Sequence, residues 1–235
     1  ENLKLDPKVF GPTLALGISP FIMVSTESLL SISFTTSLAK YGGDVAVGAM
    51  TIITSINMLV TMPLQGFTQG GQPIMSYNYG AGNVDRVKKA FFMQFGVCVG
   101  YAALFWIICM MIPNTLAGIF TTDAALAQYA SWAIRIYMAG IFSVGFQLAC
   151  QQSFMALGQA AISLVMAFLR KLILLIPLIF ILPNFFADKV FAVFLAEPVS
   201  DIIAATVTTV VFFTQFKKIM AKTQKPVEAE SQATE

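Results

Sequence analysis

The sequence predicts an all-α integral membrane protein built from six transmembrane helices. Of its 235 residues, 57% are hydrophobic and only 11% are charged, whereas a soluble domain carries about 25% charged residues. The mean hydropathy is +0.77. The apolar runs do not alternate and far exceed the roughly 10 residues of a membrane β-strand, which favours helices over a barrel. We therefore expect a bundle that crosses the bilayer.

Six segments reach the length of about 20 mostly apolar residues that a transmembrane helix needs. In chain order they lie at about 11–38, 45–73, 90–113, 124–150, 161–182 and 190–216. Short polar connections such as YGGD and NFFADK separate some of them, and Pro73 is expected to end the second helix. Because no segment is long enough to hold a soluble domain, the function must lie within the bundle.

The distribution of Lys and Arg predicts the orientation. Six spans put both termini on one side of the membrane, and that side carries nine Lys or Arg outside the spans, against two on the other. The positive-inside rule then places both termini in the cytoplasm of a multi-pass protein of the inner (plasma) membrane. We expect residues 1–10 to be a cytoplasmic linker and 217–235 a disordered cytoplasmic tail. The linker-like start without Met suggests a fragment or a processed product.

Composition also excludes several kinds of chemistry. The chain has no His, which rules out Ser-His-Asp and Cys-His catalysis and every His-based metal site. The three Cys lie in apolar runs without a CxxC pair and read as buried packing residues. The GAG triplet at 80–82 lacks the surrounding βαβ unit of a nucleotide fingerprint. We expect neither an enzyme nor a metal, cofactor or nucleic-acid site.

Charged residues inside the spans are the strongest functional candidates, since each costs about 2.5–3.5 kcal/mol at the bilayer centre. They are Glu27, Arg135, Arg170, Lys171, Glu197 and Asp201. Glu27, Arg135 and Asp201 each lie about 16 Å deep at about 1.5 Å per residue, near the midplane where transporter sites lie. Glu27 shares a helix face with Ser31 and Thr35, and it is the first candidate for cation or proton coupling. The alternative is a structural ion pair between Glu27 and Arg135.

For the other embedded charges, a structural role is at least as good an interpretation as a functional one. Asp201 is the second coupling candidate, although a structural role accounts for it at least as well. Glu197 lies four residues before it on the same face, and we expect Glu197 and Arg135 to be buried charge partners. Arg170 and Lys171 are expected to extend toward the headgroups, as long basic side chains do near helix ends.

A polar stripe in the second span predicts a cavity lining. Asn57, Thr61, Gln65, Gln69 and Gln72 recur at intervals of three and four residues and so share one helix face. We expect Ser31, Asn57, Thr61, Gln65, Gln69 and Gln147 to line a substrate cavity. Helix-to-helix hydrogen bonding is the alternative interpretation of the stripe.

Four stretches resemble the MATE family of multidrug and toxic compound extruders. They are QGFTQGGQPIMSYNYGAGNVDRVKKAF at 65–91, FMALGQA at 154–160, LRKLILLIPLIFILP at 169–183 and EPVSDIIAA at 197–205. Their order is similar to that of the family's seventh to twelfth helices. The resemblance implies the C-terminal lobe of a twelve-helix, two-lobed transporter, with the N-terminal six-helix lobe as its partner in the same polypeptide.

The resemblance also implies a function. It suggests a bacterial multidrug efflux antiporter, driven by H⁺ or Na⁺, that exports small amphipathic cationic drugs by alternating access. Glu27 falls where some branches carry a coupling acid in the seventh helix. The Asp that some members have in the tenth helix is absent, because that segment carries Arg135 and Gln147 instead. The alternatives are a lipid-linked oligosaccharide flippase of a related superfamily and a non-transporting membrane subunit.

Overall fold

The computed structural model describes the backbone of residues 7–232 and the side chains of residues 25–221. All regular structure in this part of the chain is helical, which confirms the predicted fold class. The elements are α1 (Pro7–Gly80), α2 (Val84–Met111), α3 (Pro113–Phe120), α4 (Ala124–Tyr137), η1 (Met138–Gly140), α5 (Ile141–Ala156), α6 (Ala160–Phe168), η2 (Leu169–Leu175), α7 (Ile176–Ile181), η3 (Leu182–Asn184) and α8 (Lys189–Gln232).

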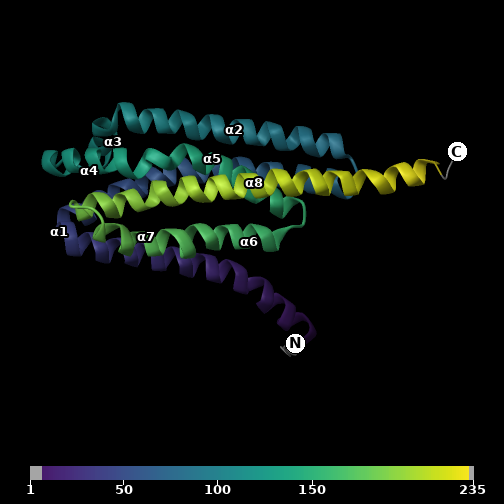
Figure 1. Ribbon diagram of the computed structural model, residues 1–235, viewed down its shortest axis with the longest axis horizontal. Coiled ribbons are helices and arrows are strands. Elements are labelled where there is room, and N and C mark those ends of the chain that lie inside the picture. The colour runs from purple at the N-terminus through teal and green to yellow at the C-terminus, as the bar shows by residue number, and fades with distance from the viewer. Residues whose placement is uncertain (1–6, 233–235) are drawn as a thin grey trace, which may run out of the picture.

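The helix α1 contains two of the six expected spans. Gly43 interrupts it with φ 65° and ψ −160°, a backbone conformation that only glycine adopts readily. At this point the chain reverses, so that the two halves of α1 run in opposite directions across the bundle (Figure 1). The second half continues to Gly80, beyond Pro73, where the sequence predicted its end. Pro73 and Gln69, the residue whose carbonyl group loses its helical partner, are both exposed.

The remaining spans follow in the expected order. The third is α2, which ends before Pro113 because the residue preceding a proline disfavours helical geometry. The fourth is α4, η1 and α5, the fifth runs from α6 to η3, and the sixth is α8. The short helix α3 was not predicted. Within the described residues, five continuous helical stretches are long and apolar enough to cross a membrane, and the first of them contains the reversal at Gly43.

Two hydrophobic cores hold the helices together. The larger core joins α1, α2, α4, α5 and the start of α8 through side chains such as Phe34, Ile53 and Ile134. The smaller core lies near the turn that joins α1 to α2, where Phe91 and Phe154 pack against Phe212 with ring centroids 4.7 and 4.9 Å apart. The midsection between the two ends of the bundle contains the charged side chains described below.

The expected linker at 1–10 and tail at 217–235 fall largely on residues whose side chains lie outside the described part of the chain. The backbone of α8 continues past residue 216 to Gln232. Both assignments stay predictions.

Candidate functional site

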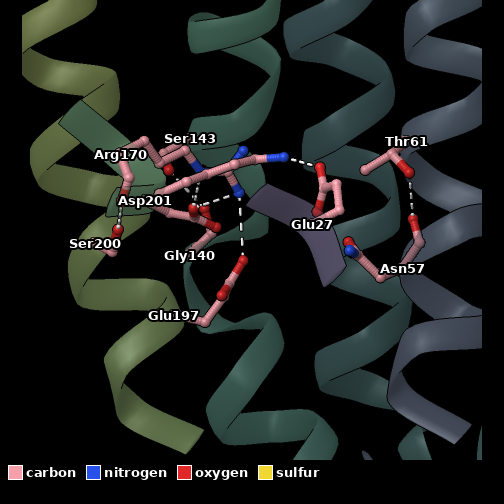
Figure 2. Close-up of polar contacts among 10 residues, drawn as sticks. Glu27, Asn57, Thr61, Gly140, Ser143, Arg170, Glu197, Ser200 and Asp201 are labelled. Carbon is pink, nitrogen blue, oxygen red and sulfur yellow. Dashed lines mark hydrogen bonds and ion pairs between the residues drawn. The ribbon is translucent and has the colours of Figure 1, made fainter. Parts of the chain in front are cut away.

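A guanidinium group paired with two carboxylates forms the centre of the candidate site. Arg170 donates to Asp201 Oδ1 at 2.6 Å and to Glu197 Oε1 at 3.3 Å. The side chains of Asp201 and Glu197 are 2% and 9% exposed, and that of Arg170 is 17% exposed. Figure 2 shows Arg170 reaching across to both acids on α8. Charges this deeply buried are tolerated in proteins only when they are paired.

The backbone around Arg170 is itself unusual. Arg170 belongs to η2, a π-helical segment, and such segments occur frequently at functional sites. Ser200 Oγ donates a hydrogen bond to the backbone carbonyl oxygen of Arg170 at 3.0 Å, which ties η2 to α8 a second time. Glu197 and Asp201 are four residues apart and therefore present their carboxyl groups on the same side of α8.

A close helix contact places the two acids at this depth. A Cβ atom added to Gly140 would lie 2.7 Å from Pro198 Cα, so the absence of a side chain at Gly140 lets α8 approach η1. Pro198 immediately follows Glu197 in the sequence. Buried Tyr137 of α4 precedes η1 and lies beside Glu197.

Lys171 connects this buried centre to α1. Its ammonium group forms an ion pair with Glu27, whose side chain is 61% exposed, while that of Lys171 is 23% exposed. Lys171 is also close enough to Glu197 and Asp201 to interact with both electrostatically. Glu27, Lys171, Arg170, Glu197 and Asp201 thus form one continuous charge network, which we call the Arg170 network.

Two predictions about the basic residues in the spans were wrong, that for Arg135 and that for Arg170 and Lys171. Arg135 is exposed, and no ion pair forms with it among the described residues, so it is not a buried charge partner. The buried apolar residues of α4 at positions 130, 133, 134 and 137 form one helical stripe, and position 135 lies off this stripe on the exposed side. Arg170 and Lys171 pair with acids inside the lobe, whereas the sequence predicted that they would extend toward the headgroups.

Most of the predicted cavity-lining residues lie on the outer side of α1. Ser31, Gln65 and Gln69 are exposed, and Asn57 and Thr61 are half-buried. Thr61 Oγ1 donates to the carbonyl oxygen of Asn57 at 2.9 Å, which places the two polar groups together (Figure 2). In the close-up, Glu27 lies next to this pair, between it and Arg170 (Figure 2). We call four exposed polar residues of α1 that the sequence singled out (Glu27, Ser31, Gln65 and Gln69) the polar face of the lobe.

Gln147 was predicted to line the substrate cavity, but the structure buries it. It is 1% exposed, and among the described residues neither its amide oxygen nor its amide nitrogen has a hydrogen-bond partner. Gln147 belongs to α5, which packs tightly against α2, as shown by Gly145, where an added Cβ would lie 2.7 Å from Cys98 O. A side chain buried there cannot line the polar face.

The described residues hold no group of three or more His, Cys, Asp or Glu side chains suited to a metal ion. A cavity of about 480 Å³ opens near the starts of α4 and α8 and is lined by Ala125, Gln128, Tyr129, Trp132, Asp188 and Val190. None of the predicted site residues lines it. The chemistry of the site is therefore that of paired charges along helices.

Comparison with protein families identifies the fold. The family model MatE matches residues 20–181. The chain belongs to the MATE family. A crystal structure of a MATE protein in the bent conformation aligns with a TM-score of 0.82 at 15% sequence identity, covering 94% of this chain. The inward-facing conformation of a multidrug resistance MATE family transporter aligns with a TM-score of 0.84 at 16% identity, covering 92%.

Two sequence relatives match this chain at 26% identity. The multidrug export protein MepA of Staphylococcus aureus (strain N315) is 26% identical over 194 residues, which cover 79% of this chain and 41% of MepA. An uncharacterized MG447 homolog of Mycoplasma pneumoniae is 26% identical over 163 residues, 68% of this chain and 28% of that protein. The chain thus spans less than half the length of these two relatives and about half of the aligned structures, 49% and 50%.

Proposed function

We propose that this chain is the C-terminal lobe of a cation-coupled antiporter that exports small amphipathic organic cations by alternating access. The N-terminal six-helix lobe would complete it, and the substrate would bind between the two lobes. The observation that carries the proposal is the polar face of α1, with Glu27 61% exposed in the middle of apolar helices. An ionised carboxylate cannot face lipid at that depth, so it requires an aqueous chamber or a partner surface.

The ion pair between Glu27 and Lys171 suggests how coupling would work. A proton or Na⁺ that binds Glu27 would neutralise it and release Lys171. An organic cation that binds Glu27 would release Lys171 in the same way, so the drug and the coupling ion would compete for one carboxylate. Such competition is the requirement for antiport, and it involves no covalent chemistry. MepA, named as a multidrug export protein, supports the substrate class by similarity.

The flippase alternative fits the charges less well. Recognition of a pyrophosphate-linked lipid calls for uncommitted cationic groups in the cavity. In the described residues, both basic side chains of the fifth span are paired with carboxylates, which leaves Arg135 as the one embedded cation without a carboxylate partner.

Replacing Glu27 with Gln tests the proposal. The native polypeptide that contains this chain would be expressed in cells lacking their own pumps, and ethidium efflux would be followed with and without a proton-gradient uncoupler. We expect Glu27→Gln to lose at least tenfold in coupled efflux at unchanged expression, because the amide carries no negative charge for a proton, Na⁺ or an organic cation to neutralise. Glu27→Asp should retain part of the activity.

Arg135→Gln is the matched control, because Arg135 is charged and exposed but outside the Arg170 network. Wild-type efflux by well-expressed Glu27→Gln would contradict the assignment. Efflux that the uncoupler does not affect would favour Na⁺ as the coupling ion. If the wild-type protein exported no organic cation, the flippase would become the better-supported function.

A further inference from the structure

The charges of the Arg170 network do not balance. It contains three carboxylates, on Glu27, Glu197 and Asp201, and two cations, Arg170 and Lys171. With every group ionised its net charge is −1. The groups that face Glu197 are Asp201 from its own helix, Arg170 and Lys171 from η2, and the neutral Tyr137 from α4. The sixth embedded charge, Arg135, is exposed on the outer side of α4 and supplies no compensation.

The two buried acids are not equally satisfied. Asp201 receives both Nε and Nη2 of Arg170 at its Oδ1, each at 2.6 Å. Arg170 reaches Glu197 only through Nη2, at 3.3 Å on Oε1, and the Tyr137 hydroxyl is the other hydrogen-bonding group beside this carboxyl. Its other oxygen, Oε2, is buried and has no hydrogen-bond partner among the described residues. An ionised oxygen without a donor in a buried site is costly, whereas a protonated one carries no charge.

We propose that Glu197 is a proton-binding residue of this lobe, and that it holds the one proton that balances the Arg170 network while Glu27 is ionised. The proton would sit on Oε2, with the Tyr137 hydroxyl beside it as a neutral polar neighbour. Lys171 connects this proton to the polar face, since it pairs with Glu27 and also interacts with Glu197.

Because Lys171 connects Glu27 to Glu197, the proton on Glu197 gains a role in transport. This part of the inference rests on the proposed antiport. When a drug cation pairs with Glu27, Lys171 is free to turn toward Glu197. The remaining charges of Lys171, Arg170, Glu197 and Asp201 then sum to zero with both buried acids ionised. Glu197 would release its proton to water on the exposed side of Lys171. Drug binding at the polar face would thereby expel a proton that was bound inside the lobe.

Infrared spectroscopy of the native polypeptide tests proton binding without requiring transport. A protonated carboxyl group has a carbonyl stretching band that a carboxylate lacks, and ¹³C at the glutamate carboxyl shifts that band. In protein synthesised with labelled glutamate at neutral pH, we expect a shifted band for the wild type and for Glu27→Asp. In Glu197→Asp the protonated group is an unlabelled aspartate, so the shift should be lost. Both substitutions conserve the charge of the network.

A second pair of variants tests the linkage. Glu27→Gln removes one negative charge, so Glu197 should ionise and the band should disappear. Arg135→Gln should leave the band unchanged. The proposal fails if the wild type has no labelled band, if the shift survives in Glu197→Asp, or if it is lost in Glu27→Asp. If the band behaves as expected and transport does not, the antiport is wrong and the proton site stands.

Discussion

At the scale of single residues, one guanidinium group donates hydrogen bonds to two buried carboxyl groups, those of Asp201 and Glu197. Arg170→Gln should therefore destabilise the protein by about 3–5 kcal/mol at neutral pH, the usual result of removing one partner from a buried ion pair. The loss should shrink in acid, because protonation removes the charges that Arg170 leaves uncompensated. Thermal unfolding in detergent micelles at several pH values would measure both effects.

Double substitution provides the control for this prediction. Arg170→Gln combined with Asp201→Asn removes the cation together with one of its acids, so it should recover part of the stability lost by Arg170→Gln alone. Arg135→Gln should cost less than Arg170→Gln, because none of the ion pairs among the described residues includes Arg135. An Arg170→Gln protein as stable as the wild type would mean that the guanidinium contributes no net stabilisation to the network.

The sequence identifies which residues are unusual but not which of them meet. A charge inside an apolar span is visible without a structure, and all five members of the Arg170 network were singled out in this way. Their partners depend on how η2 and α8 pack, and no pattern in one helix contains that information. The prediction for Arg135 was wrong: we expected a buried charge partner, but the buried apolar stripe of α4 turns its side chain outward.

At the scale of helices, the contact between η1 and α8 positions the acids of the site. Gly140→Ala would place a Cβ 2.7 Å from the backbone of Pro198, which cannot move aside as a flexible side chain would. We expect α8 to shift, with a loss of about 1–3 kcal/mol from overpacking. Gly100→Ala in α2 is the matched control, since nothing lies within 4 Å of an added Cβ there. Equal thermal stability of the two variants would contradict a tight contact at Gly140.

Helix boundaries were harder to predict than helices. Apolar runs longer than about 20 residues predict the spans in their observed order because length and composition decide them locally. The π-helical segment η2 and the 3₁₀ turn η1 depend on contacts with α8, such as the hydrogen bond from Ser200 to Arg170 O. The prediction that Pro73 ends its helix was wrong, because α1 continues through Pro73 to Gly80.

At the scale of the whole molecule, the basic residues gather at one end of the bundle. The turn between α1 and α2 is followed by Arg86, Lys88 and Lys89, and α8 carries Lys217 and Lys218 toward the same end (Figure 1). At the opposite end, Lys40 and Lys189 each lie 5.3 Å from the ring centre of Tyr41. The positive-inside rule assigns the basic end to the cytoplasm.

Cysteine labelling in intact cells would test that orientation. The three cysteines of this chain are buried, at positions 98, 109 and 150, so they should react little with the reagent. Asn83 and Asp44 are exposed in the turns at the two ends of α1's second half. A maleimide that cannot cross the membrane should label Asp44→Cys in intact cells and Asn83→Cys only after the cells are opened. Labelling of Asn83→Cys from outside would reverse the orientation. It would then place the basic turns outside, against the charge rule that sets the topology of membrane proteins.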